Sequence, residues 1–228
     1  MSDVIPPSVW LDRRRFLSVG LGAAGGIALG VGGAAGTAVA AQQKQQWRGA
    51  RSANGWPVID APRPQQIEGS GLSVAVSDGE VATVLLHVAR RFHYEIDTLR
   101  SGDVTGHGTA RTVQQSYESN YLSGTAIAIR PTGYPVGAEN GFFPHELVIV
   151  RDILAECEGV VRWGGDEQTP KESHFQIDVK PGDAHLQRVA TKIADWSGMP
   201  GQGAGSVNAF EPARRRAAVE LQRHQRSA

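Results

Sequence analysis

Two short segments with strictly alternating side chains constrain the fold of this chain most. Residues 125–129 read Thr-Ala-Ile-Ala-Ile, which places two isoleucines on one side of an extended backbone and two alanines on the other. Residues 174–179 read His-Phe-Gln-Ile-Asp-Val, so apolar side chains again alternate with smaller or polar ones. A period of two is typical of a strand with one buried face. We therefore predict two strands that each present one face to a core.

Helical spacing follows in three other segments. The residues after Ser77-Asp78-Gly79-Glu80, which we interpret as a capping box, carry apolar side chains at helical intervals. A second helix is expected over residues 144–158, opened by Pro144 and closed by Gly159, and a third over residues 183–196. Residues 160–163 read as a further short strand. The pattern predicts an α+β fold, in which helices pack on a small antiparallel sheet.

The N-terminus has the pattern of an export signal. Residues 12–17 read Asp-Arg-Arg-Arg-Phe-Leu, which matches the twin-arginine motif, and an uncharged Gly/Ala-rich stretch follows to residue 41. Ala38-Val39-Ala40 is a small-x-small cleavage site. A transmembrane anchor is the alternative, because the apolar run is long enough to span a bilayer. We interpret residues 1–40 as a cleaved twin-arginine signal peptide, so the protein is expected in the periplasm, in the cell wall or outside the cell.

The rest of the chain divides into three parts. Residues 41–70 are rich in Pro and polar side chains and are expected to form an extended N-terminal segment. Residues 71–197 carry the strand and helix patterns and form the predicted domain, which is large enough for one core. Residues 198–228 begin with a Gly-rich stretch and continue as an Arg-rich segment, which predicts a flexible linker and a tail. The tail would either contact anionic wall polymer or lipid headgroups, or remain solvated.

Charge and cysteine content exclude two classes of protein. The chain has 23 Lys and Arg residues against 23 Asp and Glu residues, so it has no overall positive field to attract nucleic acid. Cys157 is the only cysteine, which rules out an intramolecular disulfide despite the oxidising destination. The expected role of Cys157 is buried packing in the second helix.

Two motifs in the predicted domain carry a family resemblance. Residues 119–128 read Ser-Asn-Tyr-Leu-Ser-Gly-Thr-Ala-Ile-Ala, residues 163–166 read Trp-Gly-Gly-Asp, and residues 171–176 read Lys-Glu-Ser-His-Phe-Gln. They resemble the S-x-H-x-x-G-x-A-x-D and W-G-G-D…D-x-x-H-F-E segments of the zinc D-alanyl-D-alanine carboxypeptidase and L-alanyl-D-glutamate peptidase family, bacterial enzymes that trim peptidoglycan stem peptides. The resemblance implies that the two alternating strands are neighbours and that Ala128 and His174 face a shared cleft.

The chemical positions of that family pattern are changed in this chain. In the family the first His, the Asp and the last His bind zinc, and an acid three residues before the last His is the general base. Tyr121, Ala128, His174 and Lys171 stand at these four positions. Catalytic zinc needs three protein ligands, whereas alanine has no donor atom and a buried phenol stays protonated. An ammonium cannot accept the proton of a zinc-bound water. We therefore expect no zinc cofactor, with His174 as the one remaining ligand.

Three functional hypotheses remain open at this stage. The first is an exported, non-catalytic domain that binds peptidoglycan fragments or wall polymer in the former cleft. Arg100 is included because it would correspond to the family arginine that binds a substrate carboxylate. The sequence around Arg100 matches the family segment only loosely. The residues predicted to line the cleft are Arg100, Tyr121, Asp166, Lys171 and His174.

The other two hypotheses assign the chain a different role. It would be an active zinc metallopeptidase with an atypical site if another side chain replaced the missing ones. Glu172 is the candidate, because it lies two residues before His174 and would share its side of an extended strand. The last alternative is a structural or regulatory partner protein without a small ligand.

Overall fold

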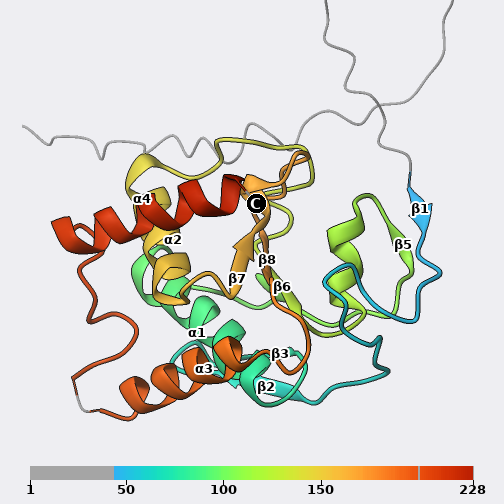
Figure 1. The fold of residues 1–228 in the computed structure, drawn as a ribbon, viewed down its shortest axis with the longest axis horizontal. Coiled ribbons are helices and arrows are strands. Elements are labelled where there is room, and N and C mark those ends of the chain that lie inside the picture. Colours follow the sequence, from blue (N-terminus) through green and yellow to red (C-terminus); the bar gives the residue numbers. More distant parts are fainter. Residues whose placement is uncertain (1–43, 200, 228) are drawn as a thin grey trace, which may run out of the picture. The chain divides into compact units, whose positions relative to one another are not determined.

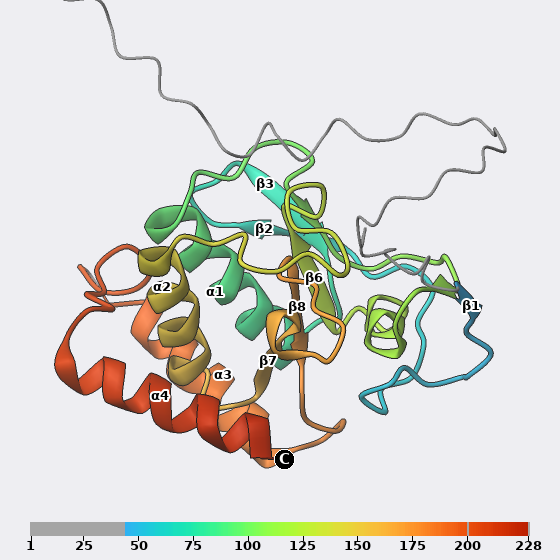
Figure 2. The same cartoon turned by 90° about the horizontal axis from the view of Figure 1, so that it is seen from above.

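The computed structural model describes residues 44–199 and 201–227, which belong to one compact unit. Three small antiparallel sheets organise it (Figures 1 and 2). The largest has the order β4-β6-β8-β7, and the other two pair β1 with β5 and β2 with β3. The strands are β1 (Gln45–Gln46), β2 (Pro64–Ile67), β3 (Leu72–Ala75), β4 (Val104–Thr105), β5 (Thr112–Val113), β6 (Ala126–Ile129), β7 (Val161–Trp163) and β8 (His174–Ile177).

Four α-helices and two short 3-10 helices complete the described fold. They are α1 (Glu80–Glu95), α2 (Pro144–Glu156), α3 (Ala184–Ser197), α4 (Pro212–Ser227), η2 (Ser116–Tyr121) and η3 (Gly164–Asp166). Helix α1 contacts β6, β8, α2 and α3, so it is the central helix of the core. Mixed helices and small antiparallel sheets confirm the predicted α+β class.

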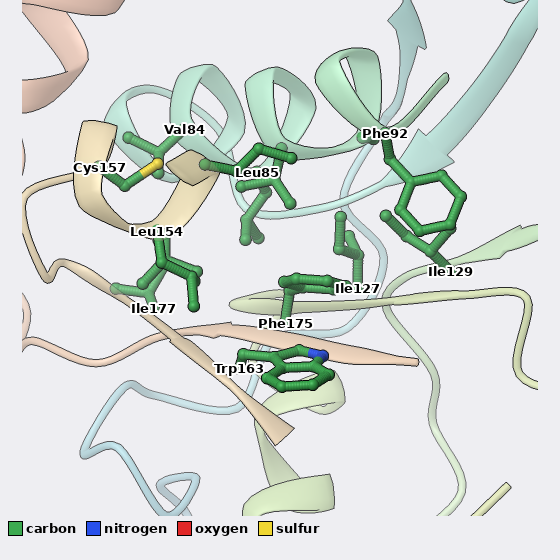
Figure 3. Close-up of a cluster of buried hydrophobic side chains, with 14 of the residues drawn as sticks. Val84, Leu85, Phe92, Ile127, Ile129, Leu154, Cys157, Trp163, Phe175 and Ile177 are labelled. Carbon is green, nitrogen blue, oxygen red and sulfur yellow. The ribbon is translucent and has the colours of Figure 1, made fainter. Parts of the chain in front are cut away.

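The core lies between α1, α2 and one face of the large sheet (Figure 3). Ile127 and Ile129 of β6 and Phe175 and Ile177 of β8 are almost completely buried there, as the alternating pattern predicted. The two strands pair in antiparallel register, with Ile127 opposite Phe175 and Ala128 opposite His174. Because successive side chains alternate between the faces of a strand, Ala128 and His174 share the sheet face that points away from α1.

The helix boundaries largely agree with the sequence pattern, but one capping interaction does not. Helix α1 begins at Glu80 as expected, yet its N-cap is Gly79, with φ of 72° and no side-chain cap. The backbone nitrogen of Ser77, which the box would bond to the Glu80 carboxylate, donates instead to the backbone oxygen of Gly124 at 2.9 Å. The predicted capping box is therefore wrong, because a tertiary partner takes the N–H group of Ser77.

The C-terminal segment differs most from the prediction. Residues 212–227 were expected to be a tail that either contacts anionic polymer or lipid headgroups or remains solvated. They form helix α4, which packs along α2 (Figures 1 and 2). Arg214 pairs with Asp152 at 2.7 Å and with Glu156 at 2.9 Å. Gln225 Nε2, which is buried, donates to the backbone oxygen of Val161 at 3.0 Å. Side chains of α2 and the backbone of β7 supply these partners, so the local sequence of the tail could not reveal them.

The segment before the domain is tied to the large sheet. Asn54 Nδ2 donates to Thr125 Oγ1 at 2.8 Å and to the oxygen of Ile177 at 2.9 Å, and Trp56 Nε1 donates to the oxygen of Val179 at 2.7 Å. The predicted signal peptide, residues 1–40, lies outside the described residues. Within the described ranges, no helix has the length and apolar character needed to cross a membrane.

Candidate functional site

Strand pairing and the end of η2 bring together the three positions that the family resemblance assigns to zinc ligands. Ala128 of β6 lies opposite His174 of β8. Tyr121, the last residue of η2, places its hydroxyl oxygen 2.7 Å from His174 Nδ1. The Tyr121 and His174 rings meet edge-on, with centroids 5.0 Å apart. Positions up to 53 residues apart in sequence thus meet at one point of the sheet face.

Both ring nitrogens of His174 have hydrogen-bond partners. His174 Nε2 lies 2.8 Å from Gln176 Oε1, which also accepts a hydrogen bond from Asn120 Nδ2 at 2.7 Å. An amide oxygen can only accept, so Nε2 carries the proton and Nδ1 accepts from the Tyr121 hydroxyl. Burial of the fully enclosed ring lowers the pKa of His174 to about 4. The imidazole is therefore neutral at pH 7, with no free lone pair.

The Tyr121 hydroxyl is held as a donor by its surroundings. Burial raises the pKa of Tyr121 well above its ordinary value, and the charge of Glu118 acts in the same direction. A phenol that keeps its proton can donate to His174 but cannot bind a metal as a phenolate. The Tyr121 side chain thus completes a hydrogen-bond chain from Tyr121 through His174 to Gln176.

Lys171 lies over the same aromatic ring and is paired. Its Nζ atom is 5.0 Å from the Tyr121 ring centroid and 2.7 Å from Glu118 Oε1. The other carboxylate oxygen of Glu118 accepts from the backbone nitrogen of Gln114 at 2.7 Å. Burial raises the pKa of Glu118, but Lys171 and the backbone donors outweigh it, so the net shift is downward. Lys171 is consequently one half of an ion pair.

A cleft of about 430 Å³ opens beside these residues. Tyr121, Ala128 and Lys171 line it together with Glu118 and the residue 105–108 loop. His107 of that loop is held by Ile59, whose backbone oxygen lies 2.9 Å from Nε2. Tyr121, Ala128 and Lys171, all predicted from the sequence to lie at the site, therefore line one cleft next to the buried His174. Glu118 was not singled out from the sequence, because nothing near it indicates that Lys171 is its partner.

Glu172, the candidate replacement ligand or base, points to a different part of the fold. Its carboxylate accepts hydrogen bonds from the backbone nitrogens of Asn140 at 2.9 Å and Gly141 at 2.8 Å. Burial raises the pKa of Glu172, partly offset by these donors. Both nitrogens of His174 are occupied by other groups, so Glu172 holds a loop in place instead of sharing a site with His174.

Arg100 and Asp166 also lie outside the described lining of the cleft. Arg100 is exposed in a turn, where its backbone nitrogen donates to Asp103 Oδ2 at 2.8 Å. The carboxylate of Asp166 accepts from Arg151 Nη2 at 2.7 Å, which joins η3 to α2. The structure therefore brings together Tyr121, Ala128, Lys171 and His174 of the predicted site, and it gives Asp166 a partner in a helix.

The donor set at this point does not fit a catalytic zinc ion. Such an ion needs three deprotonated or neutral donor groups and an open position for water. Here one position is alanine, one is a protonated phenol, and the imidazole is saturated by Tyr121 and Gln176. In the part of the chain that the structure describes, no three His, Cys, Asp or Glu side chains are grouped to hold a metal. The side chains at positions 121, 128 and 174 therefore do not supply the donor set of a catalytic zinc ion.

Comparisons with known proteins do not add to this geometry. No family model, curated protein or solved structure matches the chain.

Proposed function

We propose that this chain is an exported relative of the zinc D-alanyl-D-alanine carboxypeptidases and L-alanyl-D-glutamate peptidases that binds peptidoglycan peptide or glycan without hydrolysing it. The observation that supports this most is the Tyr121–His174–Gln176 hydrogen-bond chain. It lies where the resemblance predicts zinc, and positions 121, 128 and 174 meet there as that resemblance requires. A satisfied buried network costs little to keep, whereas a bare zinc site would leave polar groups unpaired.

The chemistry of the cleft suits a small polar ligand. Lys171 and Glu118 place a donor and an acceptor at its wall. Stem peptides present carboxylates and amides, and wall glycans present hydroxyls, so either can exchange hydrogen bonds with such a wall. Because the contact surface is small, we expect affinities in the micromolar to millimolar range.

Titration of isotopically labelled protein with defined muropeptides tests the binding. Chemical shifts should move for Tyr121, Lys171 and His107, and saturate in that concentration range. Ala128→Trp, which fills the cleft, should abolish the shifts, while Arg188→Trp on the exposed surface of α3 should preserve them. Shifts that never appear, or that lie away from these residues, would contradict the proposal.

A metal assay separates this proposal from an active peptidase. The protein is stripped with a chelator, incubated with zinc and analysed by native mass spectrometry. We expect no stoichiometric zinc and no cleavage of stem peptides. Bound zinc that disappears with His174→Ala, together with hydrolysis, would show that the site is catalytic.

A further inference from the structure

Helix α4 has two faces of different character. Its inner face is docked on the domain, with Arg214 paired to Asp152 and Glu156. Ala218 and Gln225 lie on the same face and are 6% and 7% exposed. Figure 1 shows α4 lying along α2, so the opposite side of the helix is turned away from the domain.

The outer face combines exposed apolar side chains with arginines. Val219 of α4 is 45% exposed, and Phe210, just before the helix begins, is 49% exposed, although both are large and apolar. They line a shallow groove of about 700 Å³ together with Pro212, Arg215, Arg216, Glu220 and Arg223. No ion-pair partner is found for Arg215 or Arg216 among the described residues.

The charge of α4 stands out in a chain that is otherwise balanced. The whole protein has equal numbers of acidic and basic residues, whereas the helix carries several arginines and one acidic residue, Glu220. Positive charge is therefore concentrated locally on this helix. Exposed apolar side chains interleaved with arginines are typical of helices that lie in the interface of an anionic bilayer.

We propose that the outer face of α4 binds the surface of an anionic phospholipid bilayer. Arg215 and Arg216 contact lipid phosphates, and Phe210 and Val219 enter the boundary between headgroups and acyl chains. A soluble polyanion would explain the arginines but gives the two exposed apolar side chains no partner. This contact is separate from the cleft at Tyr121 and Lys171 and does not depend on what the cleft binds.

A fluorophore placed on the outer face reports the contact locally. Cys157 is fully buried, and burial raises the pKa of its thiol to about 12, so a cysteine introduced at the surface labels selectively. The full chain carrying Val219→Cys is labelled with an environment-sensitive dye and mixed with phosphatidylglycerol vesicles. We expect a blue-shifted emission that weakens as salt is added. The dye at Arg188→Cys, exposed on α3, should show no shift.

Charge reversal provides the second part of the test. Arg215→Glu with Arg216→Glu should weaken vesicle binding at least tenfold. The matched pair Arg48→Glu with Arg188→Glu reverses two exposed arginines elsewhere and should leave binding unchanged. No shift at Val219→Cys, or an equal shift with neutral phosphatidylcholine vesicles, would overturn the proposal. Binding of soluble polyphosphate without a shift on vesicles would also overturn it, in favour of an anionic polymer.

Discussion

The hydroxyl oxygen of Tyr121 lies 2.7 Å from Nδ1 of His174 and supplies the proton for that hydrogen bond. The Tyr121 phenol cannot bind a metal as a phenolate, because burial keeps it protonated. The imidazole in turn donates its N–H proton, at Nε2, to Gln176 Oε1. Tyrosine and histidine side chains can both bind metals, but here Tyr121 and His174 are hydrogen-bonded to each other and His174 is also hydrogen-bonded to Gln176.

Tyr121→Phe should destabilise the protein by about 1–3 kcal/mol, because it leaves the buried Nδ1 atom of His174 without a donor. Chemical denaturation at pH 7.5 measures the free energy of unfolding. Tyr94→Phe removes a hydroxyl from a side chain that is 51% exposed and should change the stability little. Equal effects of the two substitutions would show that the Tyr121 hydrogen bond contributes nothing specific.

The stability should fall as the pH is lowered from about 6.5 to about 4. The pKa of His174 is about 4 in the folded protein, whereas the ordinary value, which applies to the unfolded chain, is 6.5. Over this window the unfolded chain therefore binds the proton that the folded chain excludes. The contribution is about 3 kcal/mol. Burial also lowers the pKa of His87, which adds in the same direction.

Denaturation curves at several pH values test this dependence. His174→Gln should flatten the slope between pH 6.5 and 4, whereas His145→Gln, on the exposed surface, should retain it. An unchanged slope in His174→Gln would mean that His174 is protonated in the folded protein.

Lys171→Glu should lower the stability by about 1–3 kcal/mol, since it places a second carboxylate beside Glu118 in a pair that is only 12% exposed on each side. Glu118 also caps the backbone at Gln114, so the η2 turn should loosen. Lys180→Glu reverses the same charge at an exposed position and serves as the control. A melting temperature that matches the control would show that Lys171 is effectively solvated.

Arg214→Ala should loosen α4 and destabilise the protein by about 1–3 kcal/mol, because Asp152 and Glu156 keep only part of their positive partners. Hydrogen exchange should accelerate across residues 212–227. Arg216→Ala, which removes an exposed arginine from the outer face, should leave both measurements within error. Unchanged exchange in Arg214→Ala would show that these ion pairs do not hold the helix.

Tyr121→His combined with Ala128→Asp should create a zinc site with His174, because register and hydrogen bonding already place the three positions together. Isothermal titration calorimetry should detect zinc binding in the double variant but not in Ala128→Asp alone. A folded double variant that ignores zinc would contradict the correspondence between these positions and the family's ligands.

The sequence by itself determined the elements with strong local signals. The alternation around Ile127 and Ile129 predicted strand β6 and its core-facing side, and Pro144 marked the start of α2, because strand period and helix-terminal geometry depend on neighbouring residues. Gly159 was expected at C′, but α2 ends at Glu156 with Cys157 as its C-cap, so Glu158, with φ of 51°, takes that position. The motif around His174 also predicted that Ala128 would lie near it, and the β6–β8 register bears this out.

Only the tertiary structure decided which side chains are partners across the chain. Lys171 finds Glu118, Glu172 holds the loop at Gly141, and Asp166 pairs with Arg151, although none of these pairings has a local signal. Helix α4 is a folded part of the domain because Asp152 and Glu156 of α2 bind Arg214. An ion pair between distant segments depends on how the elements pack, and that packing is a property of the whole chain.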